Sequence, residues 1–429
     1  MERKMKDSGI PWIGVIPSDW NVNKINQLFS IIGSGTTPKA TNDSNFVGNI
    51  NWIQSGDING GFIVDCKNKI AEQVLSQYSA LKLYKQPFII VAMYGASVGN
   101  ISISKIDGCV NQACCVMGKS NQYFEFLFYA IKSAKDYLIY RAEGGGQPNI
   151  SQDKLKNLRI PLPPLPTQQR IADFLDRKCA EIDELAALQE TMIAELKRYK
   201  QSVITEAVTK GLDPNVPMQD SGVEWIGKIP EGWEMKKIKQ EFIIIAGATP
   251  KSDDAENWDG DIPWITPADY TTGQIYVYGG KRNLSPKGYD SCSTSLLPQG
   301  SLIFSKRAPI GLVAINAAQL CTNQGCLGCV PKDSVFTKFV YYTTSVWTEQ
   351  FELYGSGTTF KEISANNFAN FKLAFPPLAE QRAIADYLDR KCAEIDELIA
   401  IKQQKIEALK EYKKSVIFEY VTGKKEVEE

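Results

Sequence analysis

The sequence predicts two mixed α/β domains that are related by an internal duplication and are each followed by a long helix. Three observations support this fold class. Two segments recur with a fixed offset, short β-rich runs alternate with turns and a helical stretch between them, and a long run without proline or glycine follows each variable part. The length of 429 residues allows several sizeable cores, at roughly 150 residues per domain.

The duplication is clearest in an N-terminal motif. DSGIPWIGVIPSDW at Asp7–Trp20 recurs as DSGVEWIGKIPEGW at Asp220–Trp233, an offset of 213 residues. A second segment opens with Pro-Pro-Leu and includes eleven residues that are identical in the two copies, Leu175–Leu185 and Leu388–Leu398. A period this long predicts two domain-sized copies and not a short-repeat solenoid.

These repeats divide the chain into four parts. We expect a first domain at residues 1–165, a central helix at 166–211, a second domain at 212–378 and a C-terminal helix at 379–425.

The variable parts carry signals of both strands and helices. Phe88–Met93 and Ser301–Phe304 are short apolar runs that favour buried strands. Phe124–Tyr140 has a helical pattern, and Gly/Asn turns separate the runs. Each variable part is therefore expected to be a mixed α/β domain.

The segment after each domain predicts one long helix. Neither proline nor glycine interrupts Thr167–Lys210, a run that would span about 66 Å at 1.5 Å per residue. Pro166 is expected to prevent an earlier start, and Gly211 to end the helix.

The apolar residues of this helix alternate at steps of three and four, with one step of seven where Gln189 interrupts, as in a coiled-coil seam. The nearest partner is the equivalent helix of the other copy, packed antiparallel, although a plain core between two domains would show the same stripe. The expected seam residues are Ile182, Leu185, Met192, Leu196, Tyr199 and Val203, with Ile395, Leu398 and Leu409 in the second helix.

Composition excludes several classes of enzyme. The chain has no histidine, which rules out Ser-His-Asp and Cys-His nucleophiles and histidine-ligated zinc sites. A phosphate-loop match fails because Ala113 replaces the required glycine, and no methyltransferase signature follows the Pro-Pro pairs. We expect no metal either, because Cys321, Cys326 and Cys329 have poor zinc-site spacing and are interpreted as buried apolar residues.

Charge is nearly balanced overall, with a net charge of −1 and a pI near 6.0. Residues 24–160 hold 14 basic and 9 acidic residues, whereas residues 237–373 hold 12 of each, so only the first domain is mildly basic. No signal peptide and no apolar run of membrane-spanning length are present, and we expect a cytoplasmic protein without a membrane partner.

The paired motifs DSG-x-x-WIG-x-IP and PPL-x-x-Q, the latter leading into a long helix, resemble the specificity subunit of type I restriction-modification systems. The resemblance covers essentially the whole chain. It implies that each variable part is a target-recognition domain that reads one half of a split site in double-stranded DNA. It also implies that the helices fix the half-site spacing and dock the adenine methyltransferase subunits, which number two in our expectation.

The same resemblance implies a non-catalytic chain without a cofactor of its own. S-adenosylmethionine would belong to the methyltransferase subunits, and ATP and Mg²⁺ to a restriction and translocase subunit. The helix residues expected to form the coiled coil and partner interface are Ile182, Leu185, Leu196, Ile395, Leu398 and Leu409.

Candidate DNA contacts are polar residues that differ between the copies. The loop Gly144–Ser151 corresponds to Gly355–Ser364, and Lys-Arg in copy two replaces Met-Tyr in copy one. Arginine is the commonest reader of guanine. The candidates are Tyr94, Gln147, Asn149, Lys306, Arg307, Thr358, Thr359 and Lys361.

Asn111–Gln112 and Asn323–Gln324 are shared by the two copies. Their amides suit adenine, but identical residues cannot distinguish different sequences, so a structural turn is the favoured interpretation. Two other functions stay open: a self-contained methyltransferase or nuclease, which bound cofactor or activity would support, and a protein-binding scaffold, which DNA affinity without sequence discrimination would support.

Overall fold

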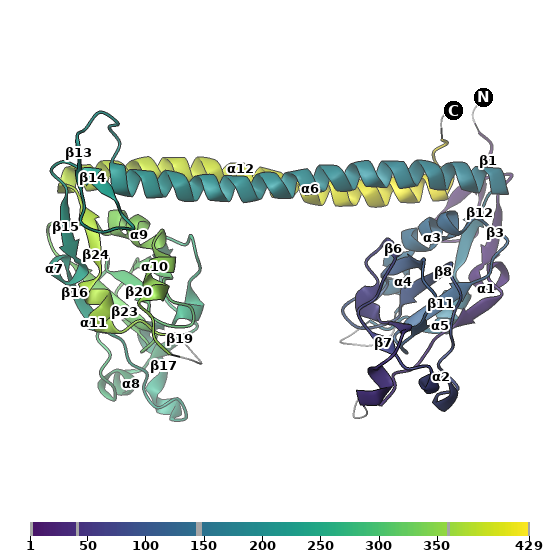
Figure 1. The fold of residues 1–429 in the computed structure, drawn as a ribbon, viewed down its shortest axis with the longest axis horizontal. Helices are drawn as coiled ribbons and strands as arrows, with labels where there is room; N and C mark the ends of the chain where they lie inside the picture. The colour runs from purple at the N-terminus through teal and green to yellow at the C-terminus, as the bar shows by residue number, and fades with distance from the viewer. Residues whose placement is uncertain (1–2, 40–42, 143–147, 358–360, 428–429) are drawn as a thin grey trace. The chain divides into compact units, whose positions relative to one another are not determined.

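The computed structural model describes residues 3–39, 43–142, 148–357 and 361–427. The chain forms two compact units that do not follow chain order. Unit 1 consists of Met1–Gln189 and Gln404–Glu429, and unit 2 of Glu190–Gln403. Each unit therefore contains one variable domain, the first part of the long helix that follows it and the last part of the other long helix (Figure 1).

A five-stranded mixed sheet in the order β4-β11-β8-β9-β6 forms the centre of the unit 1 domain, beside a three-stranded sheet in the order β10-β5-β7. Strands β12 and β3 form a two-stranded antiparallel sheet, and β1 and β2 form a hairpin. The strands are β1 Met5–Asp7, β2 Val15–Pro17, β3 Asn21–Lys24, β4 Ile31–Gly33, β5 Ile50–Ile53, β6 Phe62–Ile63, β7 Lys69–Ile70, β8 Phe88–Ala92, β9 Ile101–Ser104, β10 Cys109–Val110, β11 Cys114–Gly118 and β12 Arg159–Leu162. The helices are α1 Ile25–Leu28, α2 Gln73–Gln77, α3 Phe124–Ser133, α4 Lys135–Tyr140 and α5 Gln152–Lys156.

The domain of unit 2 repeats this topology. Its five-stranded sheet has the order β16-β23-β20-β21-β18 and its three-stranded sheet the order β19-β17-β22. The strands are β13 Met218–Asp220, β14 Lys228–Pro230, β15 Glu234–Lys237, β16 Phe242–Ala246, β17 Trp258–Ile265, β18 Tyr276–Val277, β19 Arg282–Leu284, β20 Leu302–Ser305, β21 Val313–Asn316, β22 Cys321–Thr322, β23 Cys326–Pro331 and β24 Lys372–Phe375. The helices are α7 Ile238–Glu241, α8 Pro286–Asp290, α9 Thr337–Ser345, α10 Thr348–Leu353 and α11 Ala365–Asn370.

The sequence signals for the domains are confirmed. The apolar runs become β8 and β20, in which every residue is buried, and the helical stretch at Phe124–Tyr140 becomes α3 and α4, with Ala134 between them. All-buried strands explain why these runs show no alternation of polar and apolar residues. The observed architecture is the expected duplicated α/β fold with long helices.

The first long helix, α6, extends over Leu165–Lys210, two residues earlier than expected. The prediction that Pro166 would delay its start is wrong, because the first turn of a helix needs no backbone N–H from proline. The carbonyl of Pro164 accepts hydrogen bonds from the backbone N–H groups of Thr167 and Gln168. The second long helix, α12, covers Leu378–Val421. Gly211 and Gly423 follow the two helices with φ of +73° and +70°, the left-handed conformation that ends a helix.

The glutamine of the PPL-x-x-Q motif fastens each helix to its domain. Gln168 is fully buried; its Oε1 accepts from the N–H of Tyr123, and its Nε2 donates to the carbonyl of Pro163 at 2.8 Å. Gln381 makes the equivalent bonds to Phe336 and Pro376 in unit 2. The motif therefore fixes the junction between strand and helix in both copies.

The two long helices run antiparallel within each unit. In unit 1 the rings of Phe174 and Tyr420 lie 4.4 Å apart, and Lys413 forms a 2.6 Å ion pair with Asp183, so residue numbers rise along α6 as they fall along α12. Unit 2 has the matching pair, Lys200 to Asp396, at 2.6 Å. The predicted antiparallel partnership is confirmed within each unit.

The seam between the helices differs from the predicted one. Ile182 and Ile395 are buried, but Leu185 and Leu398 are 46% and 47% exposed, so their assignment to the seam is wrong. The reason is Gln189, which is 3% exposed and belongs to the seam although its polarity suggested an interruption. Including it shifts the alternation of three and four by one position and turns the leucines outward. Tyr199, another predicted seam residue, is exposed as well. The other predicted seam residues are half-buried: Met192, Leu196, Val203 and Leu409.

The tryptophans of the N-terminal motif enclose the end of the other copy's helix. Trp20 is fully buried in the unit 1 core together with Val416, Ile417 and Val421 of α12. Trp233 occupies the same place in unit 2, beside the last turns of α6, and its Nε1 donates to Glu380 at 3.1 Å. The N-terminal motif of each copy thus supplies a buried tryptophan that packs against the C-terminal turns of the other copy's long helix.

Candidate nucleic-acid interface

Three polar segments meet at one edge of the central sheet in each domain. In unit 1 the N–H of Met93, just after β8, donates to Ala113, and the N–H of Ile150 donates to Met93, both at 2.7 Å. In unit 2 the N–H of Lys306 donates to Gly325 at 2.8 Å, and that of Ile363 donates to Lys306 at 3.0 Å. The backbone thus brings together the Asn-Gln turn, the residues after β8 or β20, and the loop before α5 or α11, which we call the segment cluster of each domain.

A short polar chain lines this place in unit 1. The hydroxyl of Thr37 donates to Oε1 of Gln112 at 2.5 Å, and Gln112 is also hydrogen-bonded to Tyr94. Partial burial raises the pKa of the Tyr94 hydroxyl, which the bond from Gln112 partly offsets. Tyr94 is therefore protonated near neutral pH and presents a hydroxyl that can donate or accept.

The equivalent place in unit 2 is charged. Nζ of Lys306 lies 2.7 Å from Oε1 of Glu362, and NH1 of Arg307 lies 3.1 Å from Oε2 of the same carboxylate. The hydrogen bond from Lys306, above all, holds the pKa of Glu362 below its usual value, and Arg307 adds to this effect. One ionised carboxylate therefore orients both predicted cations, and the Arg307 side chain stays 37% exposed.

Glu362 is the residue that sequence reasoning missed. It corresponds to Asn149 of copy one, since the flanking Ile150 and Ser151 match Ile363 and Ser364. The available signal was an acidic residue in the variable loop opposite an adjacent Lys-Arg pair. Asn149 and Lys361 are exposed, as a binding role requires. The candidates that lie outside the described residues are Gln147, Thr358 and Thr359.

The shared Asn-Gln pairs divide into two roles. Oδ1 of Asn111 accepts from the N–H of Ala113 at 3.1 Å, and Asn323 does the same for Gly325 at 2.9 Å. The structural-turn interpretation is confirmed for these asparagines. Gln112 and Gln324 instead have exposed side chains at the surface of the segment cluster.

The outward faces of the long helices carry apolar side chains in equivalent places. Unit 1 exposes Leu185, Leu188 and Tyr412 to between 46% and 50%, close to the Asp183–Lys413 ion pair. The matching residues of unit 2 are Leu398 (47% exposed), Ile401 (50%) and Tyr199 (58%). The two units therefore expose apolar side chains at equivalent positions of their long helices.

The cysteines of the second domain are packing residues. Cys321, Cys326 and Cys329 are fully buried, and burial raises the pKa of each thiol, that of Cys326 to about 12. Within the described part of the chain, no group of three or more Cys, Asp or Glu residues is placed to hold a metal ion. Nor does that part contain a helix with the length and apolarity needed to cross a bilayer.

Comparison with known proteins agrees with the fold and its duplication. The family model for the type I restriction modification DNA specificity domain matches twice, at residues 17–198 and 230–411. The MjaVIII specificity subunit of Methanocaldococcus jannaschii, a type I restriction enzyme component, is 24% identical over 95% of this chain and 93% of the relative. The MjaIX specificity subunit of the same organism is 38% identical, but the match covers 43% of this chain and 42% of that relative.

A solved structure of the type I R-M system contains a chain with the same fold. It superposes with a TM-score of 0.73 at 20% sequence identity and covers 95% of this chain and 99% of that chain. The family matches together span well over half of the sequence and fall on the two copies that the internal repeat defines. The chain therefore belongs to the type I restriction-modification DNA specificity subunits and carries the family's domain twice.

Proposed function

We propose that this chain is the non-catalytic DNA-reading component of a type I restriction-modification complex. Each variable domain reads one half of a bipartite target through the segment cluster at its sheet edge, and the long helices set the distance between the halves. The supporting observation is where the copies differ: Tyr94 and Asn149 occupy one cluster, and Arg307 and Glu362 occupy the equivalent places of the other. Base readers that differ within one scaffold suit two different half-sites.

The chemistry belongs to partner subunits in this proposal. Two adenine methyltransferase subunits supply S-adenosylmethionine chemistry, and a restriction and translocase subunit uses ATP and Mg²⁺. Each methyltransferase subunit docks on one of the exposed apolar sets, Leu185, Leu188 and Tyr412 or Leu398, Ile401 and Tyr199. Because the two sets are equivalent by duplication, they suit two copies of one partner.

The direct test is to co-express the chain with the methyltransferase subunit encoded beside it and to map N6-methyladenine in the host DNA by long-read sequencing. The expected result is one two-part asymmetric motif with a fixed gap. Exchanging the cluster residues of unit 2 alone, as in Arg307→Ala, should alter one half of the motif only. Methylation without a motif, from a complex shown to assemble, would refute the proposal in favour of a scaffold.

The docking surface has its own test. Leu185→Lys with Leu398→Lys should release the methyltransferase subunits on gel filtration while the melting temperature of the chain stays unchanged. The matched control is Leu212→Lys, another exposed leucine that lies outside both helices. A complex that survives the double substitution would place the docking surface elsewhere.

A further inference from the structure

We propose that the loops Gly35–Lys39 and Gly247–Lys251 form a duplicated contact to the DNA backbone, in which Lys39 and Lys251 each bind a phosphate. This inference rests on the proposed function and assigns a separate task to residues that the two copies share. Both loops contain Thr-Pro-Lys, and both lie against the Asn-Gln turn of the segment cluster.

The glycine that opens each loop lets it lie directly on that turn. A Cβ at Gly35 would lie 1.7 Å from the carbonyl oxygen of Val110, and one at Gly247 would lie 2.2 Å from that of Asn323. Such distances are impossible, so no other residue fits either position without a shift of the backbone. The hydroxyls of Thr37 and Thr249 then bond to Gln112 and Gln324, which fixes the loop beside the residues that differ between the copies.

The far end of each loop is held by a buried asparagine. Nδ2 of Asn45 donates to the carbonyl of Lys39 at 3.2 Å, and Nδ2 of Asn257 donates to that of Lys251 at 3.1 Å. Both asparagines are 2% exposed. The prolines before the lysines are buried in both copies, whereas the lysine side chains are exposed. The loop is thus rigid at its backbone and presents one cation.

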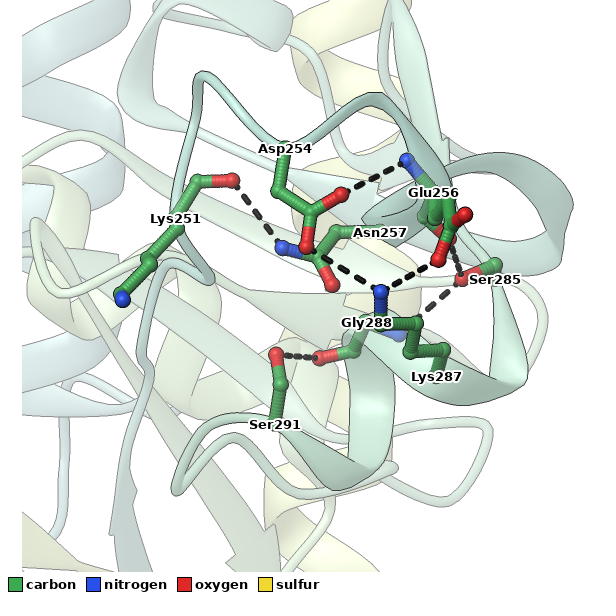
Figure 2. A network of polar contacts seen from close by, with 8 residues as sticks. All are labelled: Lys251, Asp254, Glu256, Asn257, Ser285, Lys287, Gly288 and Ser291. Carbon is green, nitrogen blue, oxygen red and sulfur yellow. Dashed lines mark hydrogen bonds and ion pairs between the residues drawn. The ribbon is translucent and has the colours of Figure 1, made fainter.

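The carboxylates near Lys251 form their ion pairs with another lysine. Nζ of Lys287 forms ion pairs with Oδ2 of Asp254 at 3.2 Å and with Oε2 of Glu256 at 2.5 Å. Figure 2 shows this network, with the amine of Lys251 directed away from it and only its carbonyl engaged. Among the described residues, neither Lys39 nor Lys251 forms an ion pair, so each ammonium is available to an anion.

Identity between the copies indicates which part of DNA the lysines meet. Residues that read bases must differ where the half-sites differ, whereas the sugar-phosphate backbone is the same in every sequence. A rigid loop with one exposed cation, kept in both copies beside variable base readers, suits a phosphate contact that sets the register of each domain on the duplex.

The test uses the complex of the chain with its methyltransferase subunits and a duplex that carries the mapped target. Lys39→Ala, Lys251→Ala and the double variant are compared with wild type for their dissociation constants over a range of salt concentrations. The slope of log affinity against log salt should become less steep by about one for each lysine removed. The ratio of affinities for the target and for duplexes with one altered base pair should stay unchanged, and Lys39→Arg should retain the wild-type slope.

Lys82→Ala and Lys372→Ala remove exposed lysines outside the loops and serve as matched controls. The inference is overturned if the control variants change the salt slope as much as the loop variants do. It is also overturned if the loop variants change neither slope nor affinity, or if the loop variants change the preference for a base pair. A wild-type complex that prefers no sequence is a different result, because it refutes the proposed function itself.

Discussion

The two variable domains share a scaffold and differ in what it presents. The buried asparagines, the Thr–Gln bonds and the sheet order are the same in both. Near the loops, however, unit 2 has an ion-pair network of Asp254, Glu256 and Lys287. In unit 1, Ser44 stands at the position of Glu256 and Gln73 at that of Lys287, so these two charges are not repeated. The two copies therefore share the residues that hold the loops and differ in the charged network beside them.

The helices show the opposite balance. Their eleven-residue identical stretches include seam residues, the Asp183 and Asp396 carboxylates and one exposed leucine each. The domain-to-helix bonds are duplicated too: the hydroxyl of Tyr129 lies 2.6 Å from Asp176, and that of Tyr342 lies 2.7 Å from Asp389. Identity on both faces of these helices is what the proposed docking of a partner on the outer face requires.

Lysine in the revised seam gives the largest expected effect. Ile182→Lys and Ile395→Lys should each lower the free energy of unfolding by about 4 kcal/mol, because each buries a charge in an apolar seam. The two costs should be equal if the copies are equivalent there. Leu185→Lys and Leu398→Lys, on the exposed face, should change it by less than about 0.5 kcal/mol. Urea denaturation measures both, and equal losses from all four variants would contradict the revised seam.

The charged cluster of unit 2 gives the next effect. Arg307→Ala should reduce discrimination at one base pair of one half-site by about 1–3 kcal/mol, if the guanidinium that Glu362 orients binds guanine through both nitrogens. Glu362→Gln should reduce discrimination at the same base pair, because it removes the carboxylate that orients Arg307 while the guanidinium keeps its positive charge. Competition binding with single-base variants of the target measures both. Unchanged discrimination in Arg307→Ala would assign base reading to other residues.

A buried lysine distinguishes the units by pH. Burial lowers the pKa of Lys132 to about 8, helped by the nearby Lys413, and its amine donates to the carbonyl of Gly60 at 2.8 Å. In the unfolded chain this amine stays protonated up to about pH 10. Between these values the unfolded state binds more protons, so the free energy of unfolding should rise with pH, by roughly 3 kcal/mol at most.

Substitution separates this lysine from other titrating groups. Lys132→Met should abolish the rise between pH 8 and pH 10, and Ser345→Ala, at the corresponding position of unit 2, should not. Chemical denaturation at a series of pH values gives the comparison. A rise that persists in Lys132→Met would assign it to another group.

The smallest effect concerns the network near Lys251. Lys287→Ala leaves the carboxylates of Asp254 and Glu256 without their ion-pair partner, and their charge would then reach the proposed phosphate contact. The melting temperature should not change, since exposed ion pairs contribute little to stability. DNA affinity should fall at low salt by less than in Arg307→Ala and recover as salt screens the charges. A loss that persists at high salt would point to a direct contact by Lys287.

Much of the molecule was predictable because its signals are local or internal to the chain. A repeat needs only a comparison of the sequence with itself, and long helices need only the absence of breakers and a periodic stripe. The strands β8 and β20 were likewise visible as apolar runs. These features depend on backbone sterics and on the burial of apolar surface, which neighbouring residues largely determine.

The two errors had different origins, and the first arose because polarity was used as a substitute for burial. Gln189 is buried although it is polar, so the seam was shifted by one position and Leu185 and Leu398 were assigned to the wrong face. Pro166 was treated as a breaker although it lies in the first helical turn, where proline is tolerated.

The sequence by itself determined the duplication, the class of the two domains and the two long helices. Only the tertiary structure decided which helix faces pack, that each domain encloses the end of the other copy's helix, and that Glu362 joins Lys306 and Arg307 across 56 and 55 positions of the chain. The physical reason is that helix and strand formation follow from local chain properties, whereas a binding surface arises where loops far apart in sequence are brought to one sheet edge by the packing of the core.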